Sequence, residues 1–193
     1  ENGNYELIVS IADVAHYIKK DSHLYKEAAK RTTSLYMVDT VIPMLPAQIS
    51  NGICSLNEKV DRLTLSCIIT ITPNGDVLSY DVVKSVINSK KKMNYDDVLS
   101  VLNGASVSGY DEFKETLLKM NELAHILRKE KMSRGYIDFD LDEPEVIQDE
   151  NGRAIDIVRV EREDGEKMIE DFMIAANETV ASHIYNMDLP FIY

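Results

Sequence analysis

The chain has 193 residues, of which 45% are hydrophobic, and a formal net charge of −12 at pH 7. This length and hydrophobic content predict one folded domain, with two small domains as the alternative. No apolar run approaches the about 20 residues that cross a bilayer, and no signal-peptide pattern opens the sequence. We therefore expect no membrane association and a cytoplasmic location. The acidic balance argues against tight nucleic-acid binding by this chain alone, because that affinity comes from clustered Lys and Arg.

The N-terminal part predicts a strand followed by a short helix. Residues 5–12 are rich in β-branched and aliphatic side chains, as strands are, and Asp13 stands at the end of this run. Residues 21–31 open with a capping residue and continue with good helix formers.

Residues 31–62 form the most informative stretch, because they fit neither a helical nor a strand period. Pro43 and Pro46 force the residues before them toward extended backbone, and residues 50–52 read as a turn. An irregular stretch with many apolar side chains inside a compact domain is typically a functional loop. Three charged residues either organise this stretch or contact phosphate: Arg31, Asp61 and Arg62.

The middle of the chain predicts an antiparallel hairpin. Leu63, Leu65, Cys67, Ile69 and Ile71 alternate and would share one face of a strand. An Asn-Gly turn within residues 73–76 leads into a second strand over residues 77–88. We expect Cys67 and the other cysteine, Cys54, to be reduced thiols rather than a disulfide.

The remainder predicts mostly helix. Asn94 caps a helix that ends at Gly104, and longer amphipathic helices are expected over residues 110–133 and 165–186. A short strand over residues 136–139 and a hairpin of residues 145–148 and 154–160 lie between them. The predicted fold class is α+β, a mostly antiparallel sheet packed with segregated helices.

Several islands of this sequence, in the same order, resemble the catalytic domain, or RNB domain, of the ribonuclease II and ribonuclease R exoribonucleases. They are Ile11–Val14, the irregular stretch of residues 31–62, Asn94–Asp97 and Ile169–Asn177. The resemblance covers nearly the whole chain. It implies an RNB-like fold and a parent enzyme that hydrolyses single-stranded RNA from the 3′ end to nucleoside 5′-monophosphates.

The resemblance also implies Mg²⁺ as the cofactor, bound by a cluster of four aspartates spaced as Asp, five residues, then Asp-x-Asp-Asp. This cluster does not occur in the sequence. By resemblance it lies upstream of residue 1, and a phosphate-binding arginine lies beyond residue 193. Residues 1–193 are therefore expected to be part of one RNB-type domain that lacks its N-terminal metal-binding segment and its C-terminal portion. Such a chain would be catalytically inert by itself, and its parent would add cold-shock-like and S1-like domains that bind RNA.

The resemblance assigns four residues to the RNA. Tyr36 and Phe139 match the two aromatic residues that clamp the last nucleotides, and stacking on an aromatic face tolerates any base. Tyr95 and Glu170 match positions that contact the sugar and help select RNA over DNA, for which the 2′-hydroxyl is the distinguishing group. Asp13 either supports the metal site from behind its ligands or caps the following turn.

Two other functions stay open at this point. A parent with a degenerate catalytic domain would hold RNA without cutting it, and the sequence upstream of residue 1 would distinguish this case from the enzyme. A structural or protein-interaction domain would suit the acidic charge, but the extended motif match argues against it.

Overall fold

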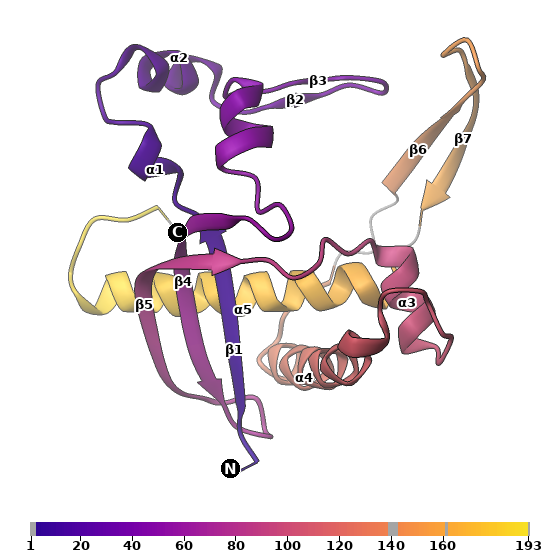
Figure 1. Cartoon of the computed structure of the whole chain (residues 1–193). Coiled ribbons are helices and arrows are strands. Elements are labelled where there is room, and N and C mark those ends of the chain that lie inside the picture. Colours follow the sequence, from indigo (N-terminus) through magenta and orange to yellow (C-terminus); the bar gives the residue numbers. More distant parts are fainter. Residues whose placement is uncertain (1–2, 139–142, 161, 193) are drawn as a thin grey trace.

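The computed structural model describes residues 3–138, 143–160 and 162–192. The predicted α+β class is correct: the helices stand apart from strands that all pair in antiparallel fashion (Figure 1). In chain order the elements are β1 (Tyr5–Ala12), α1 (Val14–Tyr17), α2 (His23–Arg31), β2 (Leu35–Tyr36), β3 (Val41–Ile42), the π-helix η1 (Gln48–Ile53), β4 (Asp61–Ile71), β5 (Val77–Asn88), α3 (Tyr95–Leu102), the 3₁₀ turn η2 (Asp111–Phe113), α4 (Lys114–Ser133), β6 (Glu143–Gln148), β7 (Ala154–Val160) and α5 (Asp164–Asn186).

The central sheet has three strands in the order β1-β4-β5. In its register, Val9 pairs with Cys67, and Cys67 pairs with Val82. The predicted Asn-Gly turn joins β4 to β5, and Gly75 there has a φ of +95°, a left-handed conformation that favours glycine. The predicted strand at residues 5–12 and the predicted central hairpin are thus confirmed.

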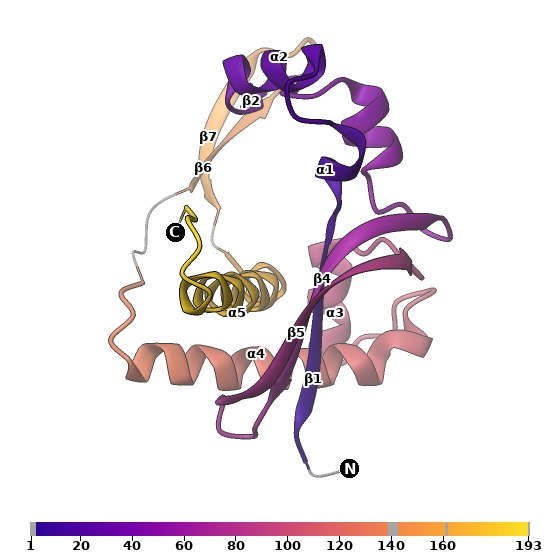
Figure 2. The same ribbon diagram turned by 90° about the vertical axis from the view of Figure 1, so that its left-hand side faces the viewer.

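The hydrophobic core lies between the sheet and the helices. α5 runs along one face of the sheet, as Figure 2 shows with α5 viewed end-on. Ile69 and Ile71 on β4 are fully buried there, and Met168 and Phe172 on α5 are buried opposite. Burial of such side chains is the main term that stabilises a domain of this size.

A buried ion-pair network joins α4 to α5. The Asp171 carboxylate, in a residue only 3% exposed, accepts from the Lys131 ammonium at 2.9 Å and from Arg128 Nε at 3.0 Å. The Lys131 ammonium also lies 4.0 Å from the centre of the Tyr136 ring. The network therefore fixes the C-terminal turn of α4 and the residue at which the chain leaves it.

The β2–β3 hairpin and η1 of the irregular stretch, together with α2 before it, form a separate layer above the sheet (Figure 1). Backbone carbonyls in it are held by arginines: Arg62 donates to the carbonyls of Ser55 (2.9 Å) and Gly52 (3.3 Å), and Arg31 donates to that of Pro43 (3.3 Å). These arginines therefore organise the loop.

Some expectations need correction. The chain is irregular over residues 136–138, where a strand was predicted, since Tyr136 follows the turn that ends α4 and pairs with no other strand. Leu65 does not join the buried part of its face but is 45% exposed, because it lines an open pocket between the sheet and residues Met173 and Ala176 of α5. α2 is capped by Ser22 and begins at His23, two residues later than expected, and the helix expected from residue 110 opens with η2 before α4.

Candidate nucleic-acid interface

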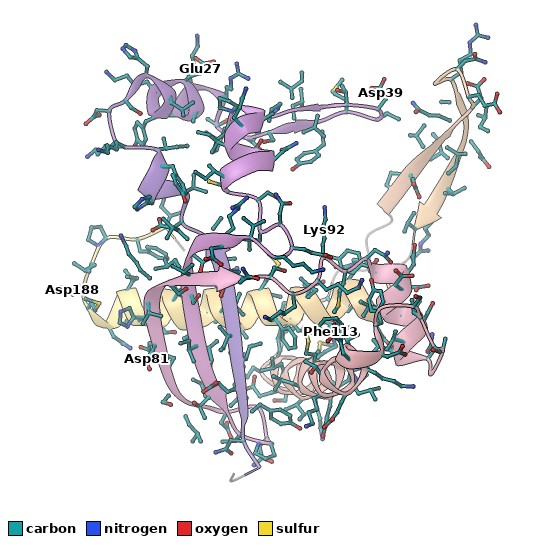
Figure 3. The ribbon with its side chains drawn as sticks, viewed as in Figure 1. Glu27, Asp39, Asp81, Lys92, Phe113 and Asp188 are labelled. Atoms are coloured by element: carbon teal, nitrogen blue, oxygen red, sulfur yellow. The ribbon has the colours of Figure 1, made fainter. Side chains whose placement is uncertain are left out.

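Tyr36 lies on the β2–β3 hairpin, and its side chain is exposed to solvent. It is 77% exposed, and Asp39 marks the turn of the same hairpin (Figure 3). The β2–β3 hairpin faces the base of the β6–β7 hairpin. Between them lies a pocket of about 520 Å³, lined by Tyr36, Met37 and Val38 of the first hairpin and by Pro144, Glu145, Val146 and Val160 of the second. An aromatic ring beside an open groove is a suitable stacking surface for a base.

Tyr95 opens α3 and packs against the start of α5. Asn94 caps α3 by accepting from the Asp97 N–H at 2.8 Å, as predicted. A Cβ atom added to Gly165 would lie 3.3 Å from Tyr95 Cδ1, so the absence of a side chain at position 165 allows this approach. The exposed Tyr95 ring is thereby placed beside the first turn of α5.

Glu170 lies one and a half turns further along α5 and is engaged by an arginine. Arg162 Nη1 donates to Glu170 Oε2 at 2.9 Å, and Arg162 Nη2 lies 3.6 Å from Asp138 Oδ1. The carboxylate is therefore connected to the segment that leads into Phe139.

The structure places two of the four predicted RNA residues, Tyr95 and Glu170, at the first two turns of α5, whereas Tyr36 lies on the β2–β3 hairpin, which faces the β6–β7 hairpin. Val160 lines the groove of Tyr36, Arg162 two residues later binds Glu170, and α5, which carries Glu170, begins against Tyr95. The fourth, Phe139, lies outside the described residues. Its expected convergence with Tyr36 on one groove stays a prediction.

Asp13 ends β1 and caps the short helix α1. Its carboxylate accepts from the His16 N–H at 3.1 Å and lies 3.9 Å from the Lys84 ammonium. Nearby, burial raises the pKa of the Cys54 thiol, although Arg62 opposes the shift. The capping role of Asp13 follows from these contacts, and a role behind a metal site stays a prediction.

The described residues offer no place for Mg²⁺: among them, no three His, Cys, Asp or Glu side chains are close enough together to hold a metal ion. The described side chains therefore do not fit the Mg²⁺ ion that the resemblance implies. No helix within the described ranges is long and apolar enough to cross a membrane.

Two residues of this region escaped the sequence analysis. Arg162 and Asp138 carry no motif that distinguishes them from surface charges, and their meeting depends on how the chain returns from the β6–β7 hairpin to α5. The spacing of eight residues between Arg162 and Glu170 gives no signal, because the first of these lies outside the helix.

Comparison with known proteins places this geometry in a family. The sequence matches the RNB domain over residues 1–193, and the chain belongs to the RNB domain family. It is 53% identical over 194 residues to ribonuclease R of Thermotoga maritima, covering 100% of this chain and 27% of that protein. The chain therefore spans about a quarter of the length of this relative.

Solved structures agree with the family assignment. Ribonuclease R of Mycoplasma genitalium in complex with ribose-methylated single-stranded RNA has a TM-score of 0.90 and 36% identity, covering 95% of this chain and 29% of that one. Yeast Ssd1, described as a pseudonuclease, has a TM-score of 0.73 at 21% identity, covering 96% and 22% of the two chains, so this likeness concerns the fold alone. The predicted resemblance to the ribonuclease R family is confirmed.

Proposed function

We propose that this chain is the substrate-gripping part of a 3′→5′ exoribonuclease that hydrolyses single-stranded RNA to nucleoside 5′-monophosphates. The observation that carries the proposal is the exposed Tyr36 beside an open groove, with Tyr95 and Glu170 at the first two turns of α5, on a chain homologous to the RNB domain of ribonuclease R. The complete enzyme would include further segments, among them cold-shock-like and S1-like RNA-binding domains.

Tyr36 supplies a stacking surface that is independent of sequence. A base stacked on an aromatic side chain contributes on the order of 1–3 kcal/mol, and every base has a face that can stack. An enzyme that advances one nucleotide at a time needs such a sequence-tolerant contact. The groove of about 520 Å³ beside Tyr36 supports this role.

Glu170 and Tyr95 distinguish ribose from deoxyribose. A carboxylate accepts a hydrogen bond from a ribose 2′-hydroxyl, which deoxyribose cannot donate. The one N–H that Arg162 donates to Glu170 Oε2 leaves further lone pairs of this carboxylate able to accept. The M. genitalium relative is in complex with ribose-methylated single-stranded RNA, which supports RNA binding within this family.

Mg²⁺ would be held by aspartates outside residues 1–193, and the phosphate by an arginine outside them. The contribution of this chain is to bind the nucleotide chain and orient its sugars. The second candidate is a non-catalytic RNA-binding domain, which would make the same RNA contacts without the aspartates that hold Mg²⁺.

The test uses the complete enzyme with Mg²⁺ and short oligonucleotides. Tyr36→Ala should raise KM about 5- to 150-fold, the equivalent of one lost stacking contact. Glu170→Gln should lower the ratio of kcat/KM on ribose to that on 2′-deoxyribose oligonucleotides. If the complete enzyme with Mg²⁺ releases no mononucleotides, the non-catalytic candidate replaces the nuclease. If both variants degrade both substrates as the wild type does, these residues do not contact RNA.

A further inference from the structure

Arg162 occupies the junction between the β6–β7 hairpin and α5. It follows β7 and directly precedes Glu163, the N-cap of α5. A capping box fixes this junction: the Glu163 N–H donates to Glu166 Oε2 at 3.2 Å, and the Glu163 side chain accepts from the Glu166 N–H. The backbone that carries the Arg162 side chain is therefore held in place by the first turn of a 23-residue helix.

Among the described residues, the guanidinium of Arg162 faces two carboxylates that come from different parts of the chain. Nη1 lies 2.9 Å from Glu170 Oε2 and Nη2 lies 3.6 Å from Asp138 Oδ1. An arginine presents five N–H donors in a rigid plane, so one side chain can hold two carboxylates in a fixed relation. A lysine ammonium lacks this planar geometry.

The segment on the Asp138 side has a second anchor, which is buried. Tyr136, two residues earlier, lies under the Lys131 ammonium, and Lys131 pairs with Asp171 at 2.9 Å. The two anchors thus reach neighbouring residues of α5, Glu170 and Asp171. The buried one fixes where the segment leaves α4, and the half-exposed one, through Arg162, sets how the segment approaches Glu170.

Resting on the role proposed above for Glu170, we propose that Arg162 is a positioning residue for the sugar site. It orients the Glu170 carboxylate toward the RNA and ties to it the segment that precedes Phe139. It also brings a positive charge to two carboxylates that would otherwise repel the RNA backbone, in a chain of net charge −12. Neither the family match nor the sequence analysis assigns Arg162 a role.

A purely structural ion pair gives a different expectation. Partly exposed pairs of this kind contribute little to stability. Losing one would then leave the discrimination between ribose and deoxyribose as it was, with any loss of activity equal on both substrates. The ratio of the two kcat/KM values is therefore the readout that separates positioning from mere structure.

The experiment compares Arg162→Gln, Arg162→Lys, Glu170→Gln and the double variant Arg162→Gln with Glu170→Gln in the complete enzyme. Substrates are two oligonucleotides that differ only in ribose or 2′-deoxyribose at the 3′-terminal nucleotides. Arg162→Gln should lower the ribose-to-deoxyribose ratio on the order of 10-fold, as a small displacement of an orienting group does. The double variant should be no worse than Glu170→Gln, because both changes act through one carboxylate.

Lys119→Gln is the matched control, since it removes another cation that pairs with a glutamate, far from this region on α4. It should leave the ratio unchanged. If Arg162→Gln does not fold, as judged by its melting curve, Arg162→Lys decides: a lowered ratio supports positioning, and a wild-type ratio overturns it.

Two failures are distinguishable. A lowered ratio in Glu170→Gln with a wild-type ratio in Arg162→Gln overturns the role of Arg162 and leaves the proposed function intact. A wild-type ratio in Glu170→Gln overturns the assignment of Glu170, and the role of Arg162 falls with it.

Discussion

The buried carboxylate of Asp171 makes a strong prediction about stability. Its side chain is 2% exposed and pairs with Lys131, itself 8% exposed, at 2.9 Å. Asp171→Asn keeps the shape of the side chain but removes the counter-charge of a buried ammonium, and breaking a buried pair in this way costs about 3–5 kcal/mol. The contact of Lys131 with the Tyr136 ring is present in both the wild type and the variant, so it does not change this difference.

Arg128, the second partner of Asp171, adds little to the cost, because its side chain is 31% exposed and water can solvate it. The expected loss in the free energy of unfolding is therefore about 3–5 kcal/mol, a fall in Tm of roughly 6–20 °C for a chain of this length. Urea and thermal denaturation of the 193-residue chain, followed by circular dichroism, measure it.

Two further variants control this prediction. Glu115→Gln breaks the exposed Glu115–Lys119 pair and should change stability by no measurable amount. Replacing both charges, Lys131→Met with Asp171→Leu, should recover at least half of the loss, because an apolar pair leaves no buried charge without a partner. A loss below about 1 kcal/mol in Asp171→Asn would refute the reasoning, since it would mean that water reaches the Lys131 ammonium.

Three other predictions concern the same chain. Gly75→Ala should lower the free energy of unfolding by about 1–2 kcal/mol, because the residue has a φ of +95° and a new Cβ would lie 3.0 Å from Glu130 Cβ. Gly104→Ala, with free space around it, should lower it less in the same denaturation assay. Burial raises the pKa of the Cys67 thiol above its ordinary value of 9.0, so iodoacetamide should modify Cys67 slowly in the native chain and fast in urea. Because the native pKa is the higher one, the stabilisation from the neutral thiol is present below pH 9.0 and is lost as the pH rises through the native pKa. Mg²⁺ and EDTA should leave the Tm of the isolated chain unchanged, and a rise in Tm with Mg²⁺ would reveal a metal site within it.

Regular elements were predictable because their signals are local. The Asn-Gly turn, the strand β4 and the capping of α3 by Asn94 each depend on a few neighbouring residues, and each was found as expected. The failure at residues 136–138 has a partly tertiary cause: Tyr136 is held by the nearby Lys131, but Asp138 is held by Arg162, which lies 24 residues further along the chain.

The candidate site was only partly predictable for the same reason. A resemblance that the family match supports predicted Tyr36, Tyr95 and Glu170 as RNA-binding residues. No local sequence pattern predicted that Arg162 would bind Glu170. The charge pattern around Arg162 is that of an ordinary surface segment. The contact of Arg162 with Glu170 depends on how the chain passes from the β6–β7 hairpin to α5. A short stretch of sequence does not reveal that path.

The central claim is that the 3′ end of an RNA strand stacks on Tyr36. The most direct measurement is the fluorescence of an oligoribonucleotide with 2-aminopurine near its 3′ end, titrated with the complete enzyme in the presence of EDTA. Tyr185→Ala is the matched control, because Tyr185 is 72% exposed, close to the 77% of Tyr36, but lies at the far end of α5. We predict that the wild type and Tyr185→Ala quench the fluorescence on binding and that Tyr36→Ala does not. Equal quenching by all three proteins would contradict the account.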